Sequence, residues 1–325
     1  MNWSRRKFLP LVLGAVAAPA WAPLARAQAY PARPIKLLVG ASAGGTTDTM
    51  ARTIAEPLSA LFREPVLVEN RPGAGGNLAA EAVARAAPDG YTLLVSFTSH
   101  TINATLYPKL PFDPVADFSP IAMISTVPSL LVGNPKLPAQ DLKELIALAK
   151  EKPGKLTIGI GGIGSSLHLA GDRFKMMAGL DILNVPYKGT APALTDVLGG
   201  QVDLMFISLV TGSAQVQAGN LRAYGVTSAK RQPSFPDLPA IGEVVPGYES
   251  EAWFGVFGPA KLPDAIVGKL NQAILGALED AKMRERLMQE GAIPAALTPA
   301  EFAKFVREDI ARWAPVVRSS GAKPN

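Results

Sequence analysis

The sequence predicts an α/β fold with two doubly wound sheets, and three observations support this prediction. Short apolar runs alternate with glycine-rich loops and helical stretches, which is the pattern of parallel strands covered by helices. The same order begins again after Pro128. A glycine-rich loop also follows an early strand in each half, so we expect two similar units with a ligand cleft between them.

The first unit begins with a buried strand at 34–39 and a glycine loop at 40–45. The next segment is helical to Leu61, because Met50, Ile54 and Leu58 recur at three-to-four-residue spacing. The remaining expected elements of this unit are a strand at 65–69, a loop at 71–76, a helix at 78–87 and a strand at 91–97.

The second unit repeats this arrangement and is followed by a helical C-terminal part. Asp141 and Glu144 have the spacing of a capping box at the start of a helix that extends to residue 150. A second capping box at 298–301 opens the last helix. The other expected elements are strands at 155–159, 182–187, 201–207 and 221–227, a loop at 161–166, and helices from 168, at 192–198 and at 264–278.

Residues 1–27 have the form of an export signal. Arg5 and Arg6 precede an apolar run at 8–21, and Ala25-Arg26-Ala27 has the small-x-small form of a cleavage site. The run of about 14 residues is too short to span a bilayer. We therefore expect a twin-arginine signal cleaved near Ala27 and a periplasmic protein, with an ordinary export signal as the alternative.

Charge and composition exclude several classes of function. The chain has 32 Lys and Arg against 27 Asp and Glu, but four of the basic residues lie in the signal, which leaves 28 against 27. This balance gives no support for a nucleic-acid or membrane-surface partner. The chain has no cysteine and only two histidines, so neither a thiolate site nor a His-rich metal cluster can form. We expect a soluble protein without a metal or cofactor.

The glycine loops at 40–45 and 161–166 resemble each other in context. Both follow a strand and precede a helix, so their backbone N–H groups and the positive helix ends face the cleft. As a pair they predict an anion site with one side in each unit. For either loop alone, the tight strand-to-helix turn that glycine permits explains the pattern as well.

Residues 40–44 also match G-x-S-x-G, the nucleophile elbow of serine hydrolases, with Ser42 in the nucleophile position. The motif follows the first strand after the signal, whereas an elbow normally lies deeper in the sheet. No HGGG-type partner for an oxyanion hole occurs in the chain. An exported serine hydrolase is therefore the less favoured interpretation.

Three side chains near the loops each have two interpretations. Asp48 lies in the first turn of its expected helix and either caps N–H groups or faces the ligand. His168 near the start of its helix either packs and caps or contacts the ligand. Tyr187 at a strand end offers a phenol to an anion, and the neighbouring Lys188 either joins it or is a solvated loop charge.

Several motifs resemble those of one receptor family. In chain order they include Ala43-Gly44-Gly45-Thr46-Thr47-Asp48, Glu69-Asn70-Arg71-Pro72-Gly73-Ala74-Gly75-Gly76, Pro88-Asp89-Gly90-Tyr91-Thr92-Leu93-Leu94, Val185-Pro186-Tyr187-Lys188-Gly189 and Gly199-Gly200-Gln201-Val202-Asp203-Leu204. The chain after the signal resembles the Bug family, the periplasmic solute receptors of the tripartite tricarboxylate transporter type. The resemblance covers essentially the whole of that chain.

The resemblance implies a type II periplasmic-binding-protein fold, in which a hinge closes two domains on one small carboxylate. Because the chain then crosses twice between the domains, we expect domain 1 at 28–127 and 253–325, and domain 2 at 128–252. The expected ligand is a dicarboxylate, tricarboxylate, amino acid or aromatic acid. The expected partners are the membrane permease subunits, and a hinged receptor of this kind is expected to be a monomer.

The resemblance also implies most of the ligand-binding residues. Both glycine loops flank the ligand, and hydroxyl groups that follow two of the strands line the cleft. The candidates are Ala43, Gly44, Gly45, Thr46, Asp48, Thr98, Ser99, Gly162, Gly164, Ser165, His168 and Ser208, together with Tyr187 from its place at a strand end.

The sequence departs from the family pattern at a few positions near the expected site. Gly40 and Ala41 stand where Pro-Phe is usual, Ile160 stands in place of a serine, and Asn184 replaces a common histidine. The ligand therefore does not carry over from the family. A sensing role that presents the closed receptor to a signalling protein would use the same hinge, and the sequence alone does not separate it from transport.

Overall fold

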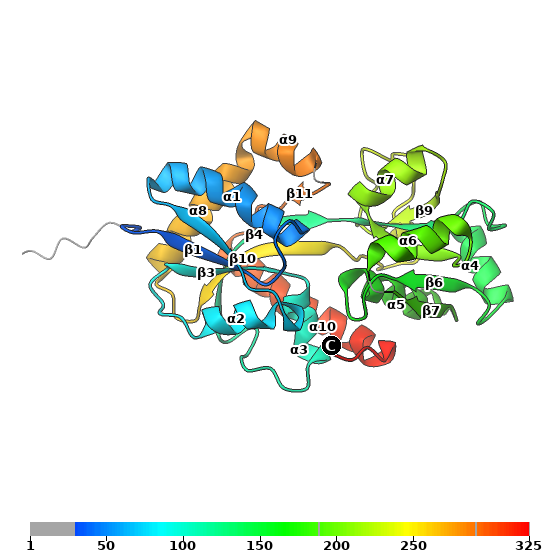
Figure 1. The fold of residues 1–325 in the computed structure, drawn as a ribbon, viewed down its shortest axis with the longest axis horizontal. Coiled ribbons are helices and arrows are strands. Elements are labelled where there is room, and N and C mark those ends of the chain that lie inside the picture. The colour runs from blue at the N-terminus through cyan, green and yellow to red at the C-terminus, as the bar shows by residue number, and fades with distance from the viewer. Residues whose placement is uncertain (1–29, 188, 290, 325) are drawn as a thin grey trace, which may run out of the picture.

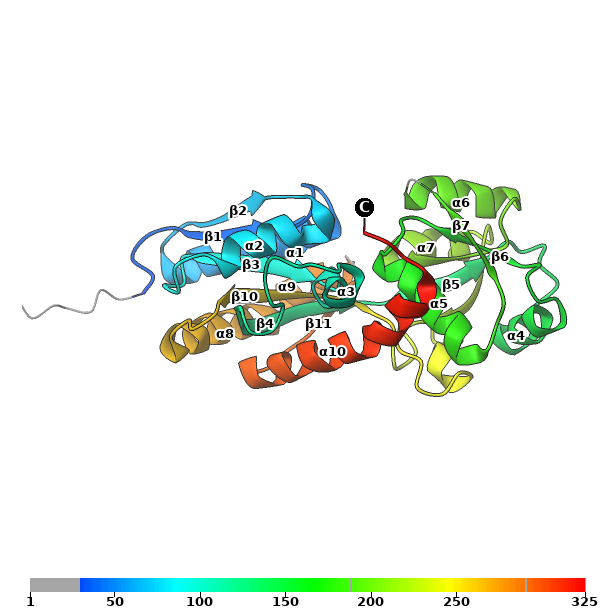
Figure 2. The same ribbon diagram turned by 90° about the horizontal axis from the view of Figure 1, so that it is seen from below.

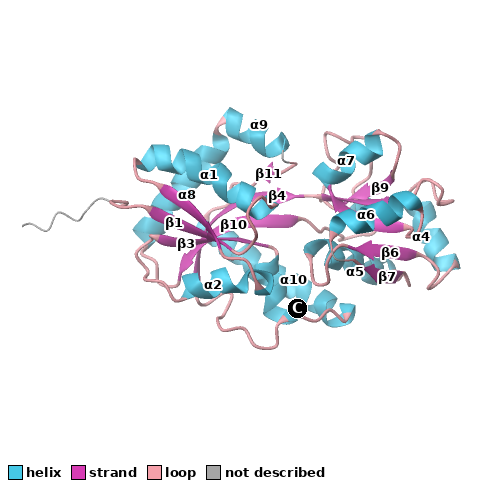
Figure 3. Ribbon diagram, viewed as in Figure 1, coloured by secondary structure: helices cyan, strands magenta, loops and turns pink. Residues whose placement is uncertain are grey.

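The chain forms two lobes, each built around one β-sheet (Figure 1). The computed structural model describes residues 30–187, 189–289 and 291–324, so the expected export signal at 1–27 lies outside the described residues. Figure 3 shows helices on both faces of each sheet. The α/β fold class with two sheets is confirmed.

The first lobe combines an N-terminal and a C-terminal part of the chain. Its sheet has the order β11-β4-β10-β3-β1-β2. The strands are β1 (Ile35–Val39), β2 (Val66–Asn70), β3 (Thr92–Phe97), β4 (Phe118–Val127), β10 (Ala252–Pro259) and β11 (Ile293–Pro294). The helices are α1 (Thr46–Phe62), the short η1 (Ala74–Gly76), α2 (Asn77–Ala84), α3 (Ser99–Leu106), α8 (Asp264–Glu279), α9 (Ala281–Gln289) and α10 (Pro299–Ser320).

The second lobe is formed by the middle of the chain. Its sheet has the order β7-β6-β8-β5-β9. The strands are β5 (Ser129–Gly133), β6 (Thr157–Ile160), β7 (Leu183–Pro186), β8 (Leu204–Ser208) and β9 (Arg222–Val226). The helices are α4 (Leu142–Glu151), α5 (Ser166–Ala178), α6 (Thr190–Gly199), α7 (Leu209–Gln217) and the short η2 (Ile241–Glu243).

Each sheet is mixed rather than wholly parallel. The expected parallel arrangement holds for β1 with β2 and β3, and for β6 with β7 and β8. In contrast, β10 is antiparallel to β3, and β5 is antiparallel to β8. The physical reason is that β5 and β10 enter their sheets from the other lobe, at the end where the parallel strands finish. A strand that enters from that end has to run in the opposite direction.

Apolar helix faces cover both sides of each sheet. In the first lobe, α1 and α8 pack Met50, Ile54 and Ile274 on one face, whereas α10 packs Phe302 and Val306 on the other. The regularly spaced apolar residues that predict α1 from sequence therefore form the face that α1 buries. The capping box at Thr298 and Glu301 is complete, whereas Glu144 accepts its hydrogen bond from the N–H of Gln140 rather than from that of Asp141. No described helix is long and apolar enough to cross a membrane.

The chain crosses between the lobes at two adjacent places. Only Pro128 separates β4 from β5, and β10 pairs with β4 from Ala252 opposite Val127. Thr227 contacts both crossings, because Ser129 N–H donates to its Oγ1 at 2.7 Å and Ser250 N–H donates to its carbonyl at 2.9 Å. Thr227 N–H also donates to the Ser129 carbonyl at 2.9 Å, and the residue is fully buried.

The last helix extends over both lobes. Figure 2 shows α10 running beneath the first lobe and reaching α5 of the second lobe. Its last turns pack Trp313, Val316 and Val317 against Ile102 of α3 and Leu169 of α5. The first turns of α10 therefore pack on the sheet of the first lobe, whereas its end contacts the second lobe.

One buried carboxylate on α10 joins three parts of the first lobe. Asp309 Oδ2 accepts hydrogen bonds from Trp253 Nε1 at 2.9 Å and from Thr101 Oγ1 at 2.6 Å. Its Oδ1 accepts from Arg312 Nε at 3.1 Å. Only 1% of Asp309 is exposed, so these donors neutralise a charge that water does not reach.

We expect Asp309→Leu to lower the free energy of unfolding by about 3 kcal/mol, because removing one member of a buried charged cluster leaves its partners unpaired. Glu308→Leu is the matched control, since Glu308 neighbours Asp309 and forms an exposed pair with Lys304. This control is expected to cost less than about 1 kcal/mol. Denaturant unfolding of both variants measures the difference, and equal losses would contradict the assigned role of Asp309.

Candidate functional site

A cavity of about 250 Å³ lies between the two lobes. Both lobes supply its lining, including residues beside each chain crossing. From the first lobe it is lined by Thr46, Thr47, Phe97, Thr98, Val127, Ala252 and Phe254, and from the second lobe by Ser129, Ser166, Leu167 and Ser208. Its volume is below the roughly 300–1,000 Å³ of pockets for drug-sized ligands, so it fits a small metabolite. A larger hollow of about 670 Å³ on the second lobe includes Arg222 and Phe235 and shares no residue with this cavity.

The first glycine loop is held by Asp48. Gly44 has a φ of +78°, in the left-handed region that favours glycine, and its N–H donates to Asp48 Oδ2 at 2.9 Å. Asp48 also accepts from Arg52 Nε at 3.0 Å and from Asn70 Nδ2 at 3.0 Å. The Arg52 guanidinium, with the Gly44 N–H and the Asn70 amide, holds the pKa of Asp48 below its ordinary value despite burial. Asp48 therefore stays ionised and does not line the cavity.

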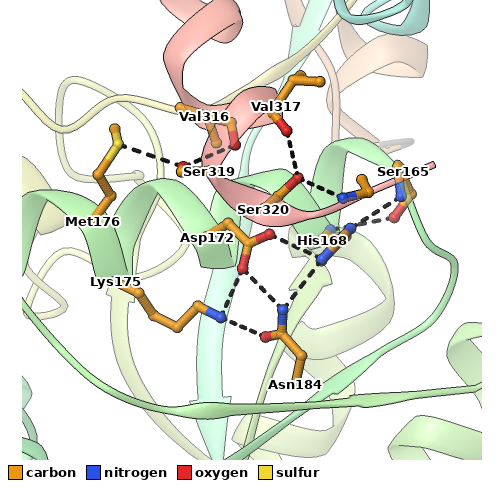
Figure 4. Close-up of polar contacts among 12 residues, drawn as sticks. Ser165, His168, Asp172, Lys175, Met176, Asn184, Val316, Val317, Ser319 and Ser320 are labelled. Atoms are coloured by element: carbon orange, nitrogen blue, oxygen red, sulfur yellow. Dashed lines mark hydrogen bonds and ion pairs between the residues drawn. The ribbon is translucent and has the colours of Figure 1, made fainter. Parts of the chain in front are cut away.

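The second glycine loop is held by His168 in a buried polar cluster (Figure 4). Gly164 N–H donates to His168 Nδ1 at 3.0 Å, and Ser165 Oγ caps α5 by accepting from His168 N–H. His168 Nε2 lies 2.9 Å from Asp172 Oδ2. Asp172 Oδ1 in turn accepts from Asn184 Nδ2 at 3.0 Å and pairs with Lys175 Nζ at 2.7 Å.

The cluster around Asp172 keeps this carboxyl charged. Burial alone would raise the pKa of Asp172, but hydrogen bonds from His168, Asn184 and Lys175 outweigh burial and lower the pKa to about 2. The Asn184 amide therefore supports the charged form of Asp172.

The structure places the remaining predicted site residues in three different ways. Thr46, Thr98 and Ser208 line the cavity. Ser208 also caps α7, and Thr98 Oγ1 accepts from the N–H of Trp253 at 2.9 Å. Ala43, Gly44, Gly45, Gly162, Gly164 and Ser165 form the two loops beside the cavity without lining it, and Ser99 is the first residue of α3.

Tyr187 forms a hydrogen bond away from the cavity. Its hydroxyl donates to Asp196 Oδ2 at 2.6 Å, and this hydrogen bond raises the pKa of Tyr187 to about 12. The tyrosine does not line the cavity. Lys188 lies outside the described residues.

Sequence reasoning missed two kinds of lining residue. The apolar ones are Phe97, Val127, Leu167, Ala252 and Phe254, and the hydroxyl ones are Thr47, Ser129 and Ser166. Thr47 and Ser166 directly follow the predicted site residues Thr46 and Ser165. The expected start of each helix could therefore have indicated these two lining residues as well. Apolar side chains at a cleft have no such signal, because the same residue types fill the core.

The departure at Gly40 has a local structural reason. A Cβ atom at Gly40 would lie 2.7 Å from Gly76 Cα, so this position has no room for a side chain. A Cβ atom at Gly76 would in turn lie 3.3 Å from Phe97 Cε1. Gly40 thus allows the η1 turn to approach β1, and that turn packs on the phenyl ring that faces the cavity.

The described histidines do not form a catalytic pair with Ser42. His100 is buried and its Nε2 lies 2.8 Å from the carbonyl of Pro114. His168 is engaged with Gly164 and Asp172, as described above. Ser42 is exposed on the first loop, and its carbonyl accepts from Gly45 N–H at 3.3 Å.

We expect the Asp172 cluster to contribute to stability above pH 4 and to lose that contribution as the pH falls toward 2. The sign follows because the pKa of Asp172 is lowered in the folded state, from an ordinary 3.8 to about 2, so acid favours the unfolded chain. Asp172→Asn is expected to flatten the stability profile between these pH values. Denaturant unfolding at each pH measures this, and the exposed Asp181→Asn is the control, which should retain the wild-type slope.

Comparison with known proteins agrees with this geometry. The family described as tripartite tricarboxylate transporter family receptor matches residues 50–322. Protein BugT of Bordetella pertussis is 38% identical over 300 residues, which covers 91% of this chain and 92% of BugT. An R. palustris protein solved with adipate superposes with a TM-score of 0.77 at 37% identity, covering 91% of this chain and 100% of that one. MatC from Rhodopseudomonas palustris with bound malate has a TM-score of 0.73 at 36% identity, covering 89% of this chain and 100% of MatC.

The family match spans most of the chain, and BugT exceeds 30% identity over nine-tenths of it. The motifs that resemble the Bug family, the two-lobed fold and the cavity between the lobes lead to the same assignment. The chain therefore belongs to the tripartite tricarboxylate transporter receptor family, a family of periplasmic solute-binding receptors.

Proposed function

We propose that this receptor captures a small carboxylate between its lobes by hinge closure and delivers it to the permease subunits of a tripartite transporter. In this proposal domain 1 comprises residues 28–127 and 253–325, and domain 2 comprises residues 128–252. The export signal at 1–27, of the twin-arginine type, is removed and the mature receptor acts in the periplasm as a monomer.

The cavity between the lobes is the observation that carries the proposal. Six of its lining side chains bear hydroxyl groups. Five of these lie at helix beginnings: Thr46 and Thr47 on α1, Ser166 on α5, Thr98 before α3 and Ser208 before α7. Helix N-termini present free N–H groups and a positive partial charge, which favours an anion. No Lys, Arg or His is among the described residues that line the cavity, so hydroxyl and N–H groups would hold the carboxylate.

The apolar part of the lining restricts the rest of the ligand. Phe97, Leu167 and Phe254 leave room for a hydrocarbon chain or ring between the polar groups. Relatives solved with adipate and with malate show that this family accepts carboxylates of different length and polarity. A small organic acid with an apolar segment fits this lining.

Hinge closure would strengthen the binding of such a ligand. When the lobes close, water leaves the cavity, and hydrogen bonds to the anion become stronger in the lower local dielectric. The ligand contacts both lobes, so it binds the closed state better than the open one and shifts the equilibrium toward closure. Closure at Pro128 and at the β9–β10 connection would move the two glycine loops toward each other.

The alternatives have less support. The hydrolase proposal needs a base beside Ser42, and both described histidines are engaged elsewhere. We therefore propose binding without catalysis, and a purified protein that never cleaves an ester supports this. A sensing role would use the same closure, but the family match favours transport.

We expect small carboxylates to raise the melting temperature of the purified protein. A ligand at about 100 times its dissociation constant stabilises the folded state by roughly 2.7 kcal/mol. Thermal unfolding with a panel of dicarboxylates, tricarboxylates, amino acids and aromatic acids measures this. The matched controls are the neutral amides of the same carbon skeletons, which should give no shift.

Two outcomes of this panel are informative beyond a positive result. A shift with an amide equal to that of its acid would contradict anion recognition. Absence of any shift requires mass spectrometry of small molecules released by denaturing the protein. A released carboxylate would explain the absent shift by prior occupation, whereas an empty protein would contradict carboxylate capture.

We expect Gly44→Val and Asp48→Ala each to weaken carboxylate binding at least about tenfold without unfolding the protein, because each disrupts a loop hydrogen bond to a charged carboxylate, which is worth about 1.5–3 kcal/mol. Gly179→Val is the matched control, because Gly179 has a φ of +65° and, like Gly44, has no atom near the site of a new Cβ. Gly179 ends α5 and does not line the cavity. Calorimetry should show that the control retains affinity, and unchanged affinity in both loop variants would remove the loops from the site.

A further inference from the structure

The two glycine loops are closed by the same hydrogen bond made with different chemistry. Gly44 N–H donates to the carboxylate of Asp48 at 2.9 Å, and Gly164 N–H donates to the imidazole of His168 at 3.0 Å. In each loop the acceptor lies four residues after the glycine, and the glycines have φ values of +78° and +75°. The next N–H closes the same tight turn in both, from Gly45 to Ser42 and from Ser165 to Gly162.

Each of these turns directly precedes the residues that line the cavity. Thr46 and Thr47 occupy the second and third positions after Gly44, and Ser166 and Leu167 occupy the same positions after Gly164. The turn therefore sets the direction in which the first residues of α1 and α5 enter the cavity. A change of either turn would move two lining residues at once.

Neither acceptor is available to a ligand. Asp48 is 3% exposed, and its two oxygens accept from Gly44, Arg52 and Asn70. His168 is 5% exposed, and its Nε2 faces the Asp172 carboxylate at 2.9 Å. Both side chains lie behind the loop rather than inside the cavity.

The contacts of His168 define its tautomer. Because Nδ1 accepts the Gly164 N–H, the proton of the neutral ring is on Nε2, which lies 2.9 Å from Asp172 Oδ2 and 3.3 Å from Asn184 Nδ2 (Figure 4). Lys175 and Asn184 hold the Asp172 carboxylate in place from α5 and β7. The negative charge of Asp172 beside Nε2 favours the proton on that nitrogen, which leaves Nδ1 free to accept the loop N–H.

We infer that Asp48 and His168 are a matched pair of positioning residues, one in each lobe. Each accepts the N–H of a left-handed glycine and thereby aims the first turn of its helix into the cavity. Asp172 acts through His168, because its charge beside Nε2 favours the tautomer in which Nδ1 is an acceptor. This inference rests on the proposed binding site, but its structural part concerns the loops alone.

Two substitutions of His168 separate positioning from simple packing. His168→Asn places the amide oxygen where Nδ1 lies, so it retains an acceptor for the Gly164 N–H. His168→Gln extends its amide toward Asp172 and leaves the Gly164 N–H without an acceptor. In the first lobe, Asp48→Asn retains an acceptor oxygen, whereas Asp48→Leu has none.

The first measurement is amide hydrogen exchange of Gly164 and Gly44 by NMR on the purified, ligand-free protein. We expect exchange at Gly164 to become about tenfold faster in His168→Gln and to stay near the wild-type rate in His168→Asn. Exchange at Gly44 should respond only to Asp48→Leu. Equal exchange rates at Gly164 in the Asn and Gln variants would overturn the inference.

The second measurement is calorimetric affinity for a carboxylate identified in the thermal panel. We expect His168→Gln to bind about tenfold more weakly and His168→Asn to restore most of the affinity. The exchange experiment needs no ligand, so it still tests the positioning role if the proposed function fails. Faster exchange in His168→Gln with unchanged affinity would separate the loop from ligand binding and overturn its role in positioning.

Discussion

The hydrogen bonds of Thr227 to both chain crossings are the constraint on which the rest of the structure depends. This single buried residue accepts from Ser129 and Ser250 and donates to Ser129, so the two connections between the lobes lie side by side. The cavity lining includes Val127 and Ser129 around the first crossing and Ala252 after the second. In the proposed hinge closure, bending at the crossings and contact with the ligand would therefore involve the same few residues.

The two lobes position the helices that reach the cavity in the same way. Each must place the beginning of a helix in the cavity, and each uses a strand, a left-handed glycine and a polar side chain in the first turn of the helix. In the first lobe this side chain is a carboxylate, which the Arg52 guanidinium and the Asn70 amide support. In the second lobe it is an imidazole beside the Asp172 carboxylate. Similar backbone geometry therefore tolerates different side-chain chemistry, provided that the side chain ends in a hydrogen-bond acceptor.

The sequence predicted the regular part of the fold because local pattern determines it. The strand, loop and helix from Ile35 to Phe62 follow from an apolar run, glycines and helical spacing. The strands β4 and β10 were not expected from sequence, because Pro120 interrupts the apolar pattern of β4 and two glycines interrupt that of β10. Gly255 is required there because a Cβ atom would clash with the ring of Phe302. The loop residues near the cavity were predictable from glycine and helix signals. That Asp48 and His168 lie behind the loops was not, because side-chain direction within a first helical turn depends on contacts with distant residues such as Asn70 and Asn184.

The contact between the end of α10 and α5 has a consequence for how such a receptor can diversify. Val316 and Val317 of α10 pack against Leu169 across the boundary between the lobes, away from the cavity lining. Any hinge motion has to change this apolar contact between α10 and α5, here called the apolar seam. The packing energy of the seam therefore adds to the energy difference between the open and closed states. Apparent affinity depends on that difference as well as on the ligand contacts. Substitutions in the seam can therefore retune how strongly the receptor holds its solute while leaving its choice of solute intact.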